Sequence, residues 1–293
     1  MTEKQKNLIT RSITGVLFVA IIVTCFLRPQ AMIFLFALAT GMTIWEFSGL
    51  VNEIEGVQIN RFISTVAGVY FFLAVAGYCL GFTPGSNLSP LMLFIPYLLT
   101  IVYLFISELF TQAPNPVNNW AYTMLSQVYI ALPFSMINVL AFAPSVSGEI
   151  GYNYLLPLSV FIFLWVNDTG AYCAGSLFGK HKLFPRVSPG KSWEGCVGGA
   201  VFVVIAAVVI GLLEADEATG SALSVLVWVG LGLIVVVFGT LGDLVESLFK
   251  RTLGIKDSGN VLPGHGGMLD RFDSSLMAIP ASVVYLCSLT MFQ

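Results

Sequence analysis

Long apolar runs recur along this sequence of 293 residues, and they limit the folds open to it. A helix crosses the hydrocarbon core of a bilayer with about 20 mostly apolar residues. Runs of this kind lie at residues 13–27, 31–50, 62–80, 91–107, 120–142, 154–173, 195–213, 222–243 and 275–292. They predict an all-α, polytopic integral membrane protein with about nine transmembrane helices.

The composition supports this prediction, because 57% of the residues are hydrophobic and only 10% are charged. A soluble domain carries about 25% charged residues. We therefore expect one membrane domain over residues 1–293, with N-terminal helices in 1–150 and the functional residues in 151–293. The net charge of −3 does not indicate a nucleic-acid partner. The five cysteines form no CxxC pair and are expected to be small core residues.

The lysines and arginines predict the orientation, because cytoplasmic loops retain them. With nine spans, the N-terminus and the even-numbered loops share one face. That face receives Lys4, Lys6, Arg11, Arg61, Lys180, Lys182, Arg186, Lys191, Lys250, Arg251, Lys256 and Arg271. The opposite face receives only Arg28. This split predicts a cytoplasmic N-terminus and a C-terminus on the far side. An uncleaved first span is expected because no small-x-small cleavage site follows Leu27.

Charged residues and glycines are concentrated at residues 247–273, between the last two apolar runs. The stretch reads SLFKRTLGIKDSGNVLPGHGGMLDRFD. Its glycines leave the backbone bendable and accessible to a ligand. A chain that is so apolar elsewhere places much of its polar chemistry here, so we expect the functional site to include this stretch.

The stretch resembles the signature of the phosphatidate cytidylyltransferase (CDP-diacylglycerol synthase) family. The matching positions are Ser247, Lys250, Arg251, Lys256, Asp257, Leu262, Pro263, His265, Gly266, Gly267, Asp270, Arg271 and Asp273. Two further stretches, at residues 167–172 and 188–195, also resemble that family. Gly190 stands where the family often carries a lysine, which leaves a phosphate contact at this position open.

The resemblance implies an integral membrane nucleotidyltransferase of phospholipid biosynthesis. It would convert CTP and phosphatidate to CDP-diacylglycerol and pyrophosphate with Mg²⁺, at the cytoplasmic face of the cell inner membrane. It also implies homodimerisation. The alternatives are a CTP-dependent lipid kinase, a cytidylyltransferase for another lipid phosphate, and a transporter. A transporter is disfavoured because its polar groups would lie near the bilayer midplane, in related halves.

Within this resemblance, Asp243 and Asp270 are the expected Mg²⁺ ligands, with Asp273 as a third candidate. Asp243, Glu246, Ser247 and Lys250 are spaced to share one face of a helix. Lys250 and Arg251 join the two aspartates as catalytic candidates. The expected substrate-binding residues are Ser247, Lys256, His265, Gly266, Gly267, Arg271, Asp168, Ser188, Lys191 and Ser192.

Several of these residues also have structural interpretations. Asp273 is suited to cap a last helix that starts near Ser274 or to form a salt bridge, and His265 to hold the glycine-rich loop. Residues 188–192 resemble a phosphate-binding turn, with Ser188 or Ser192 capping the helix that follows. Glu46, near the end of the second run, is expected to reach toward water, although it could join the site.

Overall fold

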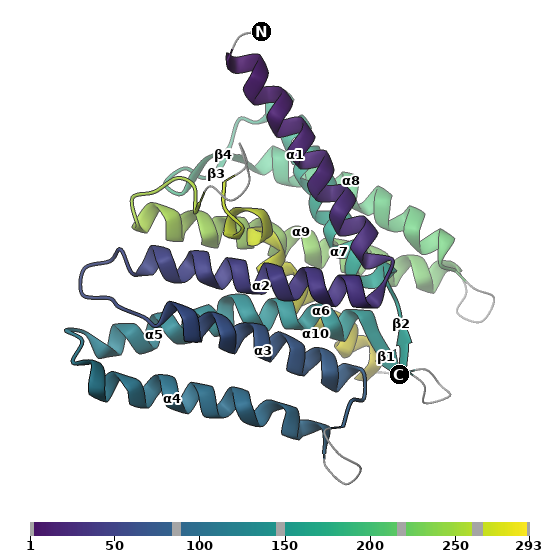
Figure 1. Ribbon diagram of the computed structural model, residues 1–293. Helices are drawn as coiled ribbons and strands as arrows, with labels where there is room; N and C mark the ends of the chain where they lie inside the picture. The colour runs from purple at the N-terminus through teal and green to yellow at the C-terminus, as the bar shows by residue number, and fades with distance from the viewer. Residues whose placement is uncertain (1–2, 84–88, 145–149, 216–220, 260–265, 292–293) are drawn as a thin grey trace. The chain divides into compact units, whose positions relative to one another are not determined.

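A computed structural model describes residues 3–83, 89–144, 150–215, 221–259 and 266–291 (Figure 1). Its contacts divide the chain into two compact units. The first comprises Met1–Pro157 and Leu253–Phe272, and the second comprises Leu158–Thr252 and Asp273–Gln293. The helix α10 therefore contributes its first turn to the first unit and the remainder to the second. The expectation of a single domain stays a prediction.

The first unit is built mainly from helices that follow one another along the chain. They are α1 (Glu3–Phe26), α2 (Pro29–Val51), α3 (Arg61–Cys79), η1 (Pro90–Phe94), α4 (Ile95–Thr111), α5 (Pro116–Ser126), η2 (Gln127–Ala131) and α6 (Leu132–Ala141). Pro29 and Pro116 are the first residues of α2 and α5, where the missing N–H breaks no helical bond. The short strands β1 (Phe142–Pro144) and β2 (Ile150–Tyr152) form an antiparallel hairpin.

Aromatic side chains from distant segments form the core of the first unit. Phe26, Phe36 and Phe134 are fully buried, and Phe272 is almost fully buried. Phe272 packs edge-on against Phe134 with ring centroids 5.1 Å apart, and against Phe36 with centroids 6.0 Å apart. Such edge-to-face pairs add about 0.5–1.5 kcal/mol to burial alone. They fix the first turn of α10 against α2 and α6.

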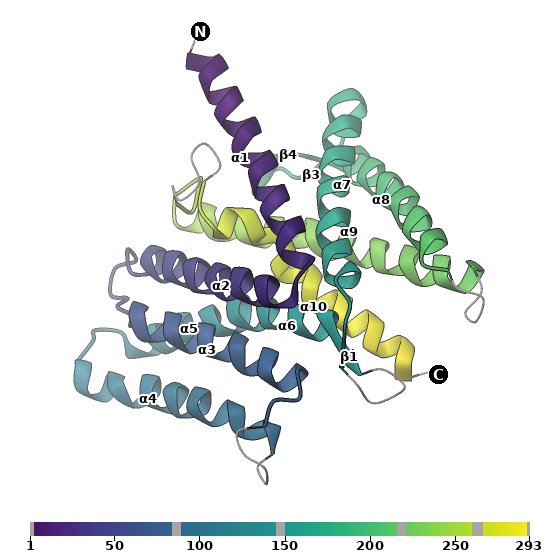
Figure 2. The same ribbon diagram turned by 45° about the vertical axis from the view of Figure 1, so that its right-hand side comes forward.

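The second unit contains α7 (Leu155–Phe178), α8 (Trp193–Leu213), α9 (Ser221–Thr252) and most of α10 (Leu269–Met291) (Figure 2). A hairpin of β3 (Lys182–Phe184) and β4 (Ser188–Ser192) joins α7 to α8. Small residues allow close helix packing. A Cβ atom on Gly170 would lie 3.1 Å from the Gly199 Cα atom of α8. A methyl group on Gly211 would overlap Val225 of α9 in the same way.

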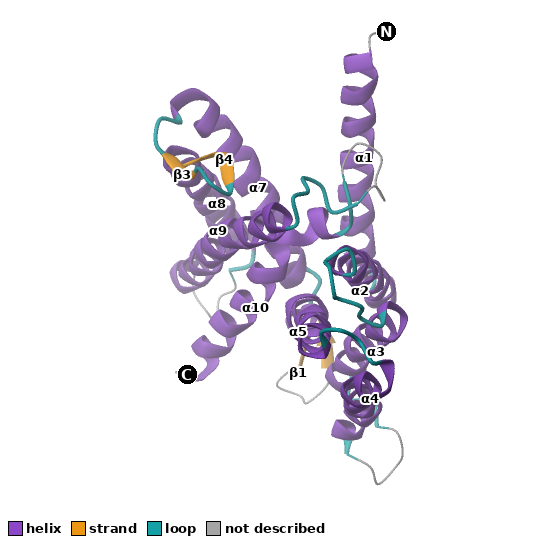
Figure 3. Ribbon diagram, turned by 90° about the vertical axis from the view of Figure 1, so that its left-hand side faces the viewer, coloured by secondary structure: helices purple, strands orange, loops and turns teal. Residues whose placement is uncertain are grey.

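The prediction of an all-α membrane protein is confirmed, since eight described helical segments are long and apolar enough to span a bilayer (Figure 3). The ninth expected span corresponds to α1, whose described apolar part, Ser12–Phe26, is shorter than the others. The last loop differs from expectation at both ends. α9 continues to Thr252 and α10 begins at Leu269, so Asp270, Arg271 and Asp273 lie on a helix.

Candidate active site

The predicted polar face of α9 is present in the second unit. Asp243 Oδ1 accepts a hydrogen bond from the Ser247 hydroxyl at 3.1 Å. Glu246 is fully buried, and its Oε2 lies 2.6 Å from Lys250 Nζ. A buried carboxylate is costly unless it is paired, so the Lys250 ammonium stabilises Glu246 in this position.

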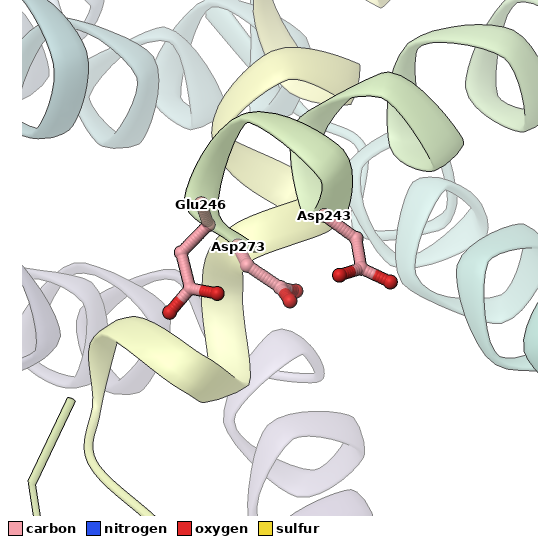
Figure 4. Close-up of side chains that lie close together, drawn as sticks. All are labelled: Asp243, Glu246 and Asp273. Carbon is pink, nitrogen blue, oxygen red and sulfur yellow. The ribbon is translucent and has the colours of Figure 1, made fainter. Parts of the chain in front are cut away.

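Asp273 of α10 joins this face and completes a cluster of three carboxylates. One oxygen from each of Asp243, Glu246 and Asp273 lies within 4.8 Å of the others (Figure 4). Gly242 makes this approach possible, because a Cβ atom there would lie 2.8 Å from the Asp273 backbone oxygen. α9 and α10 therefore meet at a glycine, one residue before the first carboxylate.

Lysine 191 reaches the same cluster from the β-hairpin. Its Nζ lies 2.5 Å from Asp243 Oδ2, with both side chains mostly covered. The expected turn at residues 188–192 is wrong, because these residues form strand β4, paired with β3. The expected cap is confirmed at Ser192, whose Oγ accepts from Gly195 N–H at 3.1 Å. The strand therefore presents Lys191 directly before the start of α8.

A cavity of about 320 Å³, with several polar side chains in its lining, lies in the second unit beside Lys191. The residues that line it include the predicted Asp168, Lys191 and Ser192, together with Asn167 and Thr240. Asn167 is only 5% exposed, and its Oδ1 has no hydrogen-bond partner among the described residues. A buried acceptor of this kind favours a ligand that carries a hydrogen-bond donor.

The first unit contains a second polar centre, formed around Glu46 of α2. The prediction that Glu46 reaches toward water is wrong, because its side chain is buried. Its carboxylate accepts from the Ser258 hydroxyl, from Met268 N–H at 2.9 Å and from Leu269 N–H at 3.1 Å. A Cβ atom on Gly267 would overlap this carboxylate, so the residue facing it must be a glycine.

Asp270 lies in the first turn of α10 and binds the same segment of backbone. Its Oδ2 accepts from Ser258 N–H and from Gly267 N–H, both at 2.8 Å. Gly266, just before, adopts a φ of +80°, which favours glycine. Glu46 and Asp270 thus organise the two described ends of the glycine-rich stretch.

The expected role of Asp273 as an N-cap is wrong. α10 begins four residues earlier, at Leu269, so Asp273 lies inside the helix and its carboxylate belongs to the cluster of three. Its Oδ1 accepts from the next backbone N–H, that of Ser274.

The other predicted residues are distributed as follows. Arg251 and Lys256 are exposed, Ser188 is half-buried in β4, and Arg271 has a buried Nε with no hydrogen-bond partner among the described residues. His265 lies outside the described residues. The pairing of Asp243 with Asp270 stays a prediction, since the two belong to different units.

The structure also adds residues to which the sequence assigned no role in binding. Glu246 is part of the carboxylate cluster, and its only signal was the three-residue spacing from Asp243. Asn167 was noticed only as part of a motif, and the unsatisfied acceptor becomes visible only in the folded structure.

The carboxylate cluster suits a hard divalent cation. Three carboxylates at this separation repel one another unless positive charge lies among them. Lys191 and Lys250 supply two such charges at Asp243 and Glu246. The available ligand atoms are all carboxylate oxygens, which Mg²⁺ prefers. The donor set therefore fits Mg²⁺.

Comparisons with known proteins show the family of the chain. A family model described as "Cytidylyltransferase family" matches residues 9–289. A protein of Haemophilus influenzae named phosphatidate cytidylyltransferase is 33% identical over 279 residues, covering 90% of this chain and 93% of the relative. Proteins of the same name from Staphylococcus haemolyticus and Staphylococcus aureus are each 42% identical over 160 residues, 55% of this chain and 56% of theirs. The chain belongs to the cytidylyltransferase family.

Proposed function

We propose that this protein is an enzyme that transfers the cytidylyl group of CTP to phosphatidate, which gives CDP-diacylglycerol and pyrophosphate. The observation that carries the proposal is the cluster of Asp243, Glu246 and Asp273 with Lys191 and Lys250 at its edge. It occurs in a membrane-spanning member of the cytidylyltransferase family whose relatives carry the name of this activity.

The reaction needs alignment and charge neutralisation more than a strong base. The phosphate of phosphatidate is already an anion at neutral pH, and one of its oxygens attacks the α-phosphorus of CTP. A new P–O bond forms there, the bond to the bridging oxygen of the β-phosphate breaks, and pyrophosphate leaves with that oxygen. The protein must hold the two phosphates in line and stabilise the charge on the leaving group.

Lysines 191 and 250, with Arg251, are the proposed cations for the phosphates of CTP. Both lysines are held by carboxylates of the cluster, which fixes their ammonium groups in position. The cavity lined by Asn167, Asp168 and Ser192 adjoins Lys191 and is assigned to the nucleotide. In this assignment the unsatisfied Asn167 Oδ1 would accept a hydrogen bond from CTP.

Mg²⁺ would be held by Asp243 and Asp273, with Glu246 as a further ligand. Asp270 is a ligand candidate from the sequence alone. When bound, it would neutralise phosphate charge and orient the triphosphate. Lys256, Arg271, His265, Gly266 and Gly267 belong to the proposed phosphate-binding stretch. Ser188 stands at the start of the strand that carries Lys191.

The site is assigned to the cytoplasmic face of the inner membrane. The distribution of lysine and arginine supports this assignment, and CTP is available on that side. A homodimer is part of the proposal through the family resemblance alone.

The proposal is tested with purified protein in lipid nanodiscs and CTP labelled at either the α- or the γ-phosphate. Cytidylyl transfer to phosphatidate places the α-label on the lipid and releases the γ-label as pyrophosphate. A lipid kinase acting on diacylglycerol would place the γ-label on the lipid instead. The proposal would be overturned if the γ-label reached the lipid, or if neither label reached the lipid when phosphatidate is supplied. If the α-label reached only a different lipid phosphate, the substrate would be reassigned.

A further inference from the structure

A groove of about 810 Å³ lies on the surface of the first unit. One wall comes from α2, including Ala37, Leu38 and Trp45, and the other from α3, including Thr65 and Val69. These two helices lie side by side in Figures 1 and 2. The groove is largely apolar along its length, as expected of a surface that accepts a hydrocarbon chain.

The part of the groove that runs from Phe34 to Trp45 corresponds in length to one leaflet of a bilayer. From Phe34 to Trp45 the helix advances by eleven residues, which at about 1.5 Å per residue is a rise of about 16 Å. Half of a hydrocarbon core is about 15 Å thick. One acyl chain extending from the membrane surface toward the midplane would therefore follow the groove to its end.

The polar end of the groove carries a fixed cation. Arg61 Nε donates to the Trp45 backbone oxygen at 2.6 Å, and its guanidinium lies 4.0 Å from the centre of the Trp45 ring. A Cβ atom on Gly49 would lie 3.0 Å from Arg61 Cζ and Nη2, so Gly49 leaves room for the guanidinium. No carboxylate among the described residues forms an ion pair with Arg61. Its remaining N–H groups suit a phosphate, which arginine binds bidentately.

The same end of the groove adjoins the glycine-rich stretch. Ser258 and Gly259 line it together with Glu46. Ser258 N–H and Oγ are the groups that bind Asp270 and Glu46. Glu46 is already bound by three donors, so its charge is compensated. An anionic head group at Arg61 would thus lie beside the backbone that leads to Asp270.

We propose that the groove between α2 and α3 is the acyl-chain and phosphate site for phosphatidate, with Arg61 as the residue that selects an anionic lipid. This inference rests on the proposed function for the identity of the lipid. Its chemistry, one hydrocarbon chain below one phosphate, comes from the groove itself.

The inference is tested by quenching of tryptophan fluorescence, because Trp45 lines the groove. Nanodiscs contain equal mole fractions of phosphatidate or phosphatidylcholine with brominated acyl chains, and the signal of Trp45 is isolated by comparison with the Trp45→Phe variant. We expect at least about a twofold excess of quenching by phosphatidate. Arg61→Gln, which removes the charge, and Ala37→Phe, which fills the groove, should abolish the excess. Arg61→Lys should keep most of it.

Ala121→Phe is the matched control, since Ala121 is exposed on α5 outside the groove. Arg61→Gln and Ala37→Phe should raise the KM for phosphatidate about tenfold and leave the KM for CTP unchanged. Equal quenching by both lipids in the unmodified protein would overturn the groove assignment, even if CTP-dependent activity is present. Selective quenching without any cytidylyl transfer would instead refute the proposed function and leave an anionic-lipid site.

Discussion

Glu46 and Ser258 are 212 positions apart in sequence, yet the serine hydroxyl donates a hydrogen bond to the glutamate carboxylate. The same carboxylate accepts from two backbone N–H groups at the start of α10. α2 therefore holds Ser258 and the start of α10 in place through one buried side chain. Glu46 is a positioning residue for the segment that carries Asp270.

Replacing Glu46 with glutamine should destabilise this segment, because charge-assisted hydrogen bonds contribute about 1.5–3 kcal/mol each and an amide donates where only acceptors are needed. We expect a lower Tm in detergent and about a tenfold or greater loss of kcat for pyrophosphate release. Ser258→Ala, which removes one donor, should cost less. Glu55→Gln changes an exposed carboxylate beyond the end of α2 and serves as the control. Unchanged Tm and kcat in Glu46→Gln would show that Ser258 and the start of α10 keep their positions without the Glu46 carboxylate.

Lys191→Met should reduce kcat/KM for CTP by about 10²-fold, because it keeps the aliphatic volume but removes the cation at Asp243. The measurement is the rate of α-label transfer at limiting CTP. Lys180→Met is the matched control, since Lys180 is exposed just before the same hairpin. If both variants matched the unmodified enzyme, Lys191 would be no more than a retained cytoplasmic charge.

The spans could be predicted because one physical requirement, an apolar length that matches the bilayer, determines each of them separately. The start of α10 was predicted too late in the sequence. Asp270, Arg271 and Asp273 are charged, and the helix was expected to begin with the apolar run. Carboxylates are favourable in the first turn of a helix, so charge there does not mark a loop. The strand β4 was missed because its five residues show no alternation of polar and apolar side chains.

Sequence spacing alone predicts contacts in the candidate site only between residues that are close in sequence. Ser247 and Lys250 follow Asp243 and Glu246 at four-residue spacing, and helix geometry alone brings them together. The pair of Lys191 and Asp243 depends on how a hairpin packs beside α9, which no local pattern encodes. Glu46 was misread because its distance from the helix end indicated access to water, whereas a distant segment covers it.

The membrane topology is tested by cysteine labelling in a background that lacks the five native cysteines. Lys256 is exposed in the segment after α9 and serves as one reporter. A membrane-impermeant maleimide should label Lys256→Cys only from the cytoplasmic side and Glu214→Cys, beyond the end of α8, only from the other side. Labelling of both from the same side would contradict the nine-span topology.

The aspartates provide the sharpest test of the proposed metal site. Asparagine keeps the size of aspartate but removes the charge, so Asp243→Asn, Asp270→Asn and Asp273→Asn should each lower kcat by about 10²-fold or more. Raising the Mg²⁺ concentration should restore each only in part. If Asp243 and Asp270 serve one ion, the double variant should be little slower than either single variant, because residues that act as a unit are not additive.

The comparison of Asp270 with Asp273 then assigns the ligands. Asp273 lies in the cluster with Asp243 and Glu246, whereas Asp270 binds the backbone of Ser258 and Gly267. A metal ligand should change the Mg²⁺ concentration for half-maximal activity, while a residue that only holds the loop should lower kcat without changing it. Glu214→Gln, an exposed carboxylate beyond the end of α8, is the control. Losses that multiply in the double variant, with an unchanged Mg²⁺ requirement, would show that Asp243 and Asp270 do not share an ion and would leave Asp243, Glu246 and Asp273 as the candidate ligands.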